Sequence, residues 1–421
     1  MKLLRLAFVF TFVSAAFAYA CSSSSSDNGG SSSGTPPPPP GTPPPGTPPP
    51  GTPPPGNPPP PPPPADGGDA GEGGATCVGN PLTADGGDSG AALVGLTATT
   101  LILNESGLTA RGVGNWFLDG VRYVDDGTPS GELVYSSFTT GAANPQLERV
   151  LPDGGGWRSL RDTSAGGGGL GIGNATKTGV VFTAFSNTAG GANDHAAILR
   201  TNPDGGGVAT DLDAGPAVNM NHLVVGPKGD VYFTDARYQS ALGATAGVYR
   251  MAPGGAVTAI ETGATASVGG GESNRFNGIA LSPDATKLYV SLTGSDEIRV
   301  YTVSAADGSV AVPANKEFVG PAAAGGALQT TDSPAGLAVD VGGNVWVAEA
   351  NADPGTAAGR VEVYSPAGKL LGQIDFTTAV TRPTQVAFGG PNNTALFIAT
   401  ESSGAALAAI YKYSSRCAGV R

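Results

Sequence analysis

Three oxygen-bearing side chains and one imidazole stand at the starts of short apolar segments that recur along the chain. They are Asp119, Asn221 and Asn277, with His222 directly after Asn221. One carboxylate and two amide oxygens are ligands that suit a hard cation such as Ca²⁺. An imidazole beside them could act as a general base or as a nitrogen ligand for Zn²⁺. The alternative without chemistry is that the amides cap strand ends and the histidine packs in the interior.

The segments that carry these residues have the pattern of a buried β-strand, a tight turn and a second strand. The clearest is 276–291, in which Asn277 and Gly278 open the first strand and Ser-Pro-Asp makes the turn. Similar segments lie at 222–233, 336–347 and 385–398. Glycine-rich turn sequences recur every ~50–60 residues, the spacing of a four-stranded propeller blade with its loops.

These repeats predict an all-β fold, a six-bladed β-propeller over residues 92–417. Five hairpins mark five blades, and a sixth begins at Pro383 and ends at Tyr413. A strand from the other end of the domain, near 93–103, is expected to complete it. Seven blades is the alternative, because 92–115 has no clear pattern. First strands that start around one channel would bring Asp119, Asn221 and Asn277 together.

The N-terminal quarter of the chain has the composition of a targeting segment followed by a tether. Residues 1–20 have a positive start, an apolar run too short to span a bilayer, and small residues before Cys21. This predicts a bacterial lipoprotein signal peptide with Cys21 as the lipidation site; the alternative is an ordinary signal that leaves Cys21 free.

The segment that follows, residues 21–91, is rich in serine, proline and glycine. We expect it to be a disordered linker whose proline runs favour an extended spacer, with a docking site for a proline-recognition domain as the alternative. The predicted location is therefore the bacterial cell envelope, with the chain lipid-anchored through Cys21 at the outer membrane or the periplasmic face.

The net charge bears on nucleic-acid binding, and the cysteines bear on a possible disulfide. The net charge is −12 and no basic cluster is present, which excludes nucleic-acid binding. We expect a monomer. Cys77 and Cys417 flank the predicted domain in a compartment that permits disulfides, so we expect a bridge that staples its two ends. Two free thiols are the alternative.

Three motifs carry a resemblance to a known family. They are Asn-Gly-Ile-Ala-Leu-Ser-Pro-Asp at 277–284, Gly-Leu-Ala-Val-Asp at 336–340 and Val-Ala-Phe-Gly-Gly-Pro at 386–391. The chain resembles the gluconolactonase / senescence-marker-protein (regucalcin) / luciferin-regenerating-enzyme-like family over about 115–413. The resemblance implies a six-bladed propeller that hydrolyses sugar lactones or related esters. It also implies one divalent cation in the channel, Ca²⁺ first and Zn²⁺ second, which polarises the carbonyl and lowers the pKa of a bound water.

This chain matches only some of the family's metal-binding residues. Asn277 and Asn221 match family asparagines, but His222 follows where the family has aspartate. Asp119 stands where the family has glutamate, and Ala335 stands where the family has a metal-binding aspartate. Because the number of charged ligands tunes cation affinity, the loss at 335 predicts weak or absent metal binding unless Asp332 or a shifted backbone replaces that ligand.

Two functions remain open at this stage. The first is an envelope-anchored, metal-dependent lactonase or esterase for a small-molecule substrate, with Asp119, Asn221 and Asn277 holding the cation and His222 assisting catalysis. The second is a propeller lipoprotein that has lost catalysis and serves as a binding scaffold, which the alanine at 335 favours.

Overall fold

The computed structural model describes the chain in separate ranges, all of which belong to the unit 61–421; the chain's other unit is 1–60. The described residues are 100–104, 116–124, 131–139, 146–153, 158–162, 172–176, 179–185, 196–202, 209–213, 220–236, 246–263, 275–320, 333–350, 359–376, 382–401, 408–415 and 417–420. The predicted signal peptide and linker, with Cys21 and Cys77, lie outside these ranges. Within them, no helix has the length and apolar character needed to cross a membrane.

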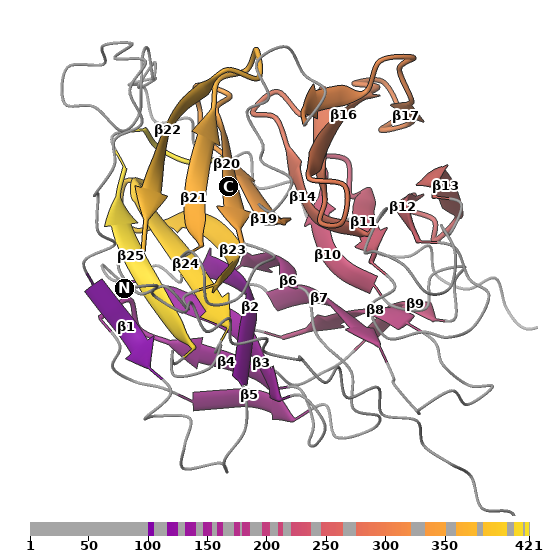
Figure 1. The fold of residues 1–421 in the computed structure, drawn as a ribbon. Helices are drawn as coiled ribbons and strands as arrows, with labels where there is room; N and C mark the ends of the chain where they lie inside the picture. Colours follow the sequence, from indigo (N-terminus) through magenta and orange to yellow (C-terminus); the bar gives the residue numbers. More distant parts are fainter. Residues whose placement is uncertain are drawn as a thin grey trace, which may run out of the picture. The chain divides into compact units, whose positions relative to one another are not determined.

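The described residues form 25 strands in five antiparallel sheets (Figure 1). Three sheets have four strands: β6 (Ile172–Thr176), β7 (Gly179–Phe185), β8 (Ala196–Thr201) and β9 (Ala209–Asp213); β10 (Met220–Val225), β11 (Val231–Asp235), β12 (Gly247–Met251) and β13 (Val257–Thr262); β19 (Pro334–Val339), β20 (Val345–Glu349), β21 (Arg360–Tyr364) and β22 (Leu370–Asp375). A fourth has five strands: β14 (Phe276–Leu281), β15 (Lys287–Leu292), β16 (Glu297–Val303), β17 (Val310–Ala311) and β18 (Glu317–Val319).

The fifth sheet has eight strands and joins the two ends of the domain. It contains β1 (Thr100–Asn104), β2 (Trp116–Val124), β3 (Glu132–Thr139), β4 (Gln146–Val150), β5 (Arg158–Asp162), β23 (Arg382–Gly389), β24 (Ala395–Glu401) and β25 (Ala409–Ser414). β1 pairs with β25 in this sheet, as expected for a strand from the N-terminal side, and Figure 1 shows them side by side.

The prediction of six blades is wrong, because the structure has five. β2 pairs with β24 at Phe117 and Glu401, and this pairing fuses the meander β2–β5 with the meander β23–β24–β25–β1. The sequence pattern predicts a separate blade for each of these two meanders. A hydrogen-bonded link between residues that lie at opposite ends of the domain leaves no local signal in either strand.

The first strands of the meanders follow one another in a ring. β2, β6, β10, β14, β19 and β23 contact their neighbours in that order, and β23 contacts β2. Hydroxyl groups link several neighbouring sheets, because each donates a hydrogen bond to a backbone carbonyl in the first strand of the next meander. Thr234 donates to Asn277 O at 2.5 Å, Ser291 to Ala335 O at 2.5 Å, and Thr384 to Leu118 O at 2.5 Å. We call this set of strands the strand ring.

Local sequence accounts for the hairpins that build each sheet. All six residues of β14 are buried, including the polar Asn277, as expected for a short strand in the interior. The turn after it is closed by Ala285 N, which donates to Ser282 O at 2.8 Å. Between β10 and β11 the turn needs a left-handed residue, which Gly229 supplies with φ of 83°.

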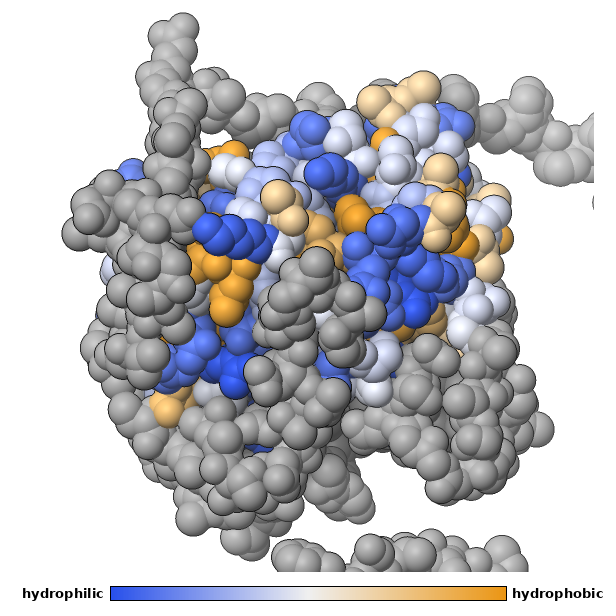
Figure 2. All heavy atoms as spheres, turned by 45° about the horizontal axis from the view of Figure 1, so that its top comes forward, coloured by the Kyte–Doolittle hydropathy of each residue, from blue (hydrophilic) through white to orange (hydrophobic). Residues whose placement is uncertain are grey.

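Apolar side chains fill the spaces between neighbouring sheets. Trp346 of β20 meets Phe388 of β23 edge-on, with ring centroids 5.4 Å apart. Val312 and Val341 are the exposed large hydrophobic residues of the described part. On the face in Figure 2, hydrophilic and hydrophobic residues are accordingly interspersed.

The C-terminal residues fold back onto the turns of two sheets. Val341 N donates to Ala418 O, Val420 N donates to Val339 O, and Gly419 N donates to Asn393 O. Cys417 lies just before this segment, is buried and is disulfide-bonded. Its partner is outside the described residues, so the pairing with Cys77 stays a prediction.

Replacing Cys417 with serine should lower the free energy of unfolding by about 2–5 kcal/mol, because the bridge restricts the unfolded chain. Urea unfolding monitored by tryptophan fluorescence measures the loss. Cys77→Ser should cause the same loss, and the double variant should lose no more than either single variant. A Cys77→Ser protein as stable as the parent would contradict the predicted pairing.

Candidate functional site

The structure brings Asp119 and His222 into direct contact. His222 Nε2 lies 2.9 Å from Asp119 Oδ1, and the two side chains are 1% and 17% exposed. An ionised carboxylate only accepts hydrogen bonds, so Nε2 is the donor. Asp119 comes from β2 and His222 from β10, with β6 between them in the strand ring. The contact therefore joins strands that are next but one in the ring rather than adjacent strands.

Repeated bulges at the starts of the first strands aim these side chains. In β10, regular pairing with β11 stops at Met220 and resumes at Leu223, which leaves Asn221 and His222 in the bulge. β14 has the same irregularity at Asn277 and Gly278. Bulges bend a strand and redirect its side chains, and they are common beside active sites.

β19 has an equivalent bulge near its start. It holds Ala335 and Gly336 between the paired residues Pro334 and Leu337. Asn221, Asn277 and Ala335 thus occupy equivalent first positions of three bulges. His222 occupies the second position, where the following two repeats have Gly278 and Gly336. The β2 bulge lies between Asp119 and Arg122.

Backbone and hydroxyl groups hold the pair in place. Gly120 N donates to Asp119 Oδ1 at 2.7 Å, and Ser136 Oγ donates to Asp119 O at 3.0 Å. His222 N donates to Thr234 Oγ1 at 3.1 Å. Because Thr234 also donates to Asn277 O, a single hydroxyl links the His222 backbone with that of Asn277.

The other predicted site residues have different surroundings. The Asn277 side chain is buried, and its Nδ2 donates to Thr293 Oγ1 at 2.9 Å. Asn221 is half-buried in the bulge beside His222. Ala335 is buried, and its carbonyl accepts from Ser291. Of the predicted set, Asp119 contacts His222 directly, and Thr234 links the backbones of Asn277 and His222.

The donor set does not fit the divalent cation that the sequence resemblance implies. Ca²⁺ takes six to eight oxygen ligands, several of them carboxylates. Across the described residues, no group of three or more His, Cys, Asp or Glu side chains is arranged to hold a metal ion. Asp119 Oδ1 already accepts from His222 and from Gly120 N, and Ala335 offers no side-chain donor.

One buried polar atom at the site has no partner in the described structure. His222 Nδ1 is buried and makes no hydrogen bond there. An unpaired polar atom in the interior costs free energy, so buried groups of this kind in native proteins call for a specific explanation. With Nε2 donating to Asp119, Nδ1 carries the lone pair of the neutral imidazole. In this tautomer Nδ1 is the proton-accepting atom of the ring.

A second carboxyl near the pair was missed at the sequence level. Glu401 ends β24, is 8% exposed, and lies 2.6 Å through Oε1 from Nη1 of Arg382. Burial raises the pKa of Glu401 to about 7, the negative charge of Asp119 adds to this rise, and Arg382 opposes it. The pairing of β24 with β2 brings Glu401 beside Phe117, two residues before Asp119.

The raised pKa of Glu401 predicts a pH-dependent stability. In the unfolded chain the carboxyl ionises near 4.5, whereas in the folded chain it ionises near 7. Between these pH values the folded state keeps a proton that the unfolded state releases, so stability falls as pH rises from about 4.5 to about 7. The shift corresponds to about 3 kcal/mol.

Glu401→Gln should remove this slope. Urea unfolding of parent and variant at pH 5 and pH 8 measures it, and the variant should gain about 3 kcal/mol on the parent between the two pH values. Subtracting the two proteins cancels the other titrating groups. A difference between parent and variant that is the same at both pH values would contradict the raised pKa.

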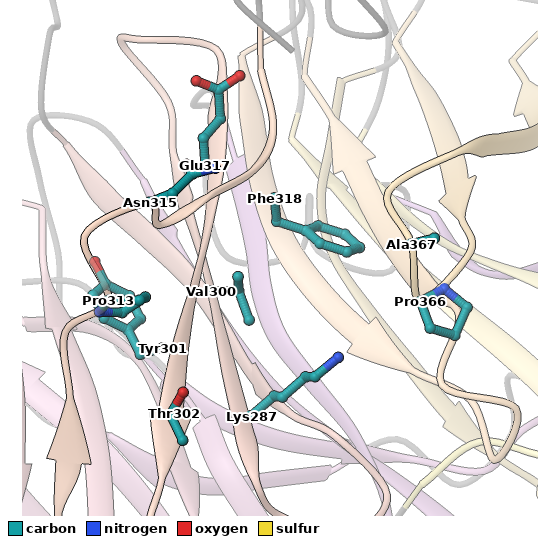
Figure 3. A pocket seen from close by; sticks show the side chains of 10 residues that line it. All are labelled: Lys287, Val300, Tyr301, Thr302, Pro313, Asn315, Glu317, Phe318, Pro366 and Ala367. Carbon is teal, nitrogen blue, oxygen red and sulfur yellow. The ribbon is translucent and has the colours of Figure 1, made fainter. Parts of the chain in front are cut away.

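A pocket among the described residues lies elsewhere. It has a volume of about 340 Å³ and is lined by residues of β15, β16 and β18 and by the turn at Pro366. Figure 3 shows Lys287 extending toward Phe318 and Pro366. None of its lining residues belongs to β2 or β10, so this pocket is separate from the Asp119–His222 pair.

Comparison with known proteins gives a family model and several relatives. The model described as SMP-30/Gluconolactonase/LRE-like region matches residues 159–402, a range that includes His222, Asn277 and Glu401 and begins after Asp119. A pentonolactonase of Haloferax volcanii is 28% identical over 181 residues, 43% of this chain and 53% of that protein. A gluconolactonase of Zymomonas mobilis is 31% identical over 172 residues, 37% of this chain and 40% of that protein. The chain thus spans about half the length of these curated relatives.

Solved structures support the same fold. A luciferin-regenerating enzyme matches with a TM-score of 0.53 and 18% identity, over 73% of this chain and 96% of that one. A regucalcin of Agrobacterium tumefaciens, described as a calcium-binding protein, matches with a TM-score of 0.51 and 15% identity, over 73% and 95%. At these identities the likeness concerns the β-propeller fold alone.

Proposed function

The chain belongs to the SMP-30/gluconolactonase/LRE-like family, and on this basis we propose that it hydrolyses a lactone or a related ester at the Asp119–His222 pair. The names of the two curated relatives, both lactonases, support a small cyclic ester as the substrate class. The observation that carries the proposal is the 2.9 Å contact between two residues 103 positions apart. It pairs a carboxylate of β2 with an imidazole of β10, the combination that a general base needs.

His222 is the general base in this reaction. Its Nδ1 takes a proton from water, and the water oxygen attacks the lactone carbonyl carbon to form a tetrahedral intermediate. The ring C–O bond then breaks, and the proton on Nδ1 passes to the departing ring oxygen. The product is the open-chain hydroxy acid. Asp119 fixes the tautomer of His222 and stabilises the imidazolium that forms between the two proton transfers.

A panel of aldonic γ- and δ-lactones tests the proposal. Hydrolysis releases a carboxylic acid, so a pH indicator follows the rate. We expect turnover of at least one lactone class, retained in EDTA because no step of this mechanism passes through a cation. Loss of turnover in EDTA with recovery on adding Ca²⁺ would contradict the general-base mechanism. No turnover across the panel would contradict the hydrolase.

A second candidate function is a binding scaffold without catalysis. The burial of His222, which is 1% exposed, and the alanine at 335 favour it. Calorimetry separates the two candidates, since a scaffold binds its small-molecule ligand with heat but forms no hydroxy acid. Product formation at a rate that depends on His222 would exclude the scaffold.

We also propose that the protein acts as a monomer in the bacterial cell envelope, lipid-anchored through Cys21. The support is the sequence of residues 1–20 and the spacer-like composition of 21–91. Metabolic labelling with palmitate should tag the parent protein, and Cys21→Ser should abolish the label. A label that persists in the variant would contradict this anchor.

A further inference from the structure

The position of His222 differs from its equivalents in the strand ring. In the next two repeats the second bulge position is glycine, and a side chain there would collide with the following strand. A Cβ on Gly278 would lie 2.1 Å from Ala335 O, and one on Gly336 would lie 1.7 Å from Gln385 Oε1. β10 alone among these three strands carries a side chain at this place, and that side chain contacts Asp119 of β2, the strand next but one in the ring.

His222 Nε2 donates a hydrogen bond to Oδ1 of Asp119, an oxygen that could otherwise coordinate a cation. Asp119 is the one carboxylate of the predicted ligand set, and its Oδ1 accepts from both Nε2 of His222 and Gly120 N. An N–H donor and a metal ion cannot share the same lone pairs of one oxygen. The imidazole and Gly120 N therefore occupy Oδ1, so that a dication would have to coordinate Asp119 through Oδ2 alone.

The loss of a carboxylate at 335 is consistent with this replacement. Ala335 has the first bulge position of β19, equivalent to Asn221 and Asn277, and is buried. A carboxylate there would be a second buried negative charge without a cation to balance it, which is costly in the protein interior. An imidazole donor at 222 and an uncharged side chain at 335 together form a site that needs no metal.

We propose that the His222 imidazole has taken the place of a divalent cation in the strand ring, so that Asp119 is held by a hydrogen bond instead of by a metal ion. The inference concerns what fills the ring and does not depend on the chain being a hydrolase. It predicts that two substitutions convert the site back: His222→Gly, which copies Gly278 and Gly336, and Ala335→Asp, which supplies the missing carboxylate.

The test is Ca²⁺ binding by the full chain, measured by the shift of the thermal midpoint and by calorimetric titration. The parent protein should keep the same midpoint in EDTA and in millimolar CaCl₂ and should show no saturable heat. The double variant should bind Ca²⁺ at least tenfold more tightly than the parent and regain thermal stability on binding, because a second carboxylate raises cation affinity. The matched control, His222→Gly with Ala367→Asp, adds the same charge on an exposed turn and should not respond.

Two results would overturn the proposal. One is saturable Ca²⁺ binding by the parent protein that raises its thermal midpoint and is lost in Asp119→Asn. The other is a folded double variant that responds to Ca²⁺ no better than its matched control, which would mean that the imidazole is not what excludes the cation. Both readouts are free of activity, so a failure here is distinguishable from a failure of the lactone assay.

Discussion

Replacing His222 with glutamine should lower kcat/KM for lactone hydrolysis by about 10²–10⁴-fold, the usual contribution of a general base. Glutamine can still donate a hydrogen bond toward Asp119, but an amide cannot take a proton from water at neutral pH. The chain should therefore fold normally and bind substrate while losing turnover. Initial rates with the best lactone of the panel, combined with a thermal midpoint, measure the two effects separately.

The only other histidine supplies the control for this change. The sequence has two histidines, and His195 lies outside the described residues. His195→Gln should leave kcat/KM within about twofold of the parent, because no step of the mechanism uses it. Equal rates for the parent and His222→Gln would remove His222 from the reaction.

Gly278→Ala should destabilise the fold by about 3 kcal/mol, near the upper end for overpacking. The added Cβ would lie 2.1 Å from the backbone oxygen of Ala335 and 2.9 Å from the Cα of Gly336. Backbone atoms cannot rotate away as a flexible side chain does, so β14 and β19 must separate. The same movement would strain the hydrogen bond from Gly278 N to Ser291 Oγ, which is 2.8 Å long.

Gly254→Ala is the matched control for that prediction. Nothing lies within 4 Å of a Cβ at this turn position, and alanine reduces the freedom of the unfolded chain. The control should change stability by less than about 1 kcal/mol. Urea midpoints of the two variants give the comparison, and equal stability would show that β14 and β19 do not approach as closely as the structure has them.

Local pattern was enough to predict the strands but not how the sheets close. β14 with its Ser-Pro-Asp turn, and β10 with the turn at Gly229, follow from apolar alternation and turn residues that lie within a dozen positions of one another. The pairing of Phe117 with Glu401 depends on the closure of the whole domain. Because of that pairing, the structure has five blades where six were predicted. No sequence feature near either residue indicates the pairing.

Individual residues of the site could be predicted from the sequence, but their contacts could not. Asp119 and His222 were found because each stands at the start of an apolar strand. Their direct contact was not predicted, since it depends on a bulge that aims His222 across the ring. Glu401 and Arg382 were missed because they reach the site only through β24 and β23.

One signal in the sequence could have found the residues that support the site. Thr234 and Ser291 are hydroxyl residues near the ends of second strands, after Tyr-Phe and Tyr-Val. Both donate to a carbonyl of the next first strand. A hydroxyl at this place in successive repeats indicates a bond between sheets rather than a surface polar residue.

A double-mutant cycle on lactone hydrolysis, with Asp119→Asn and His222→Gln, measures whether the two residues act as one catalytic unit. Because Asp119 acts only through His222, the double variant should be no slower than His222→Gln alone. Losses that multiply in the double variant would show that Asp119 and His222 act independently of each other.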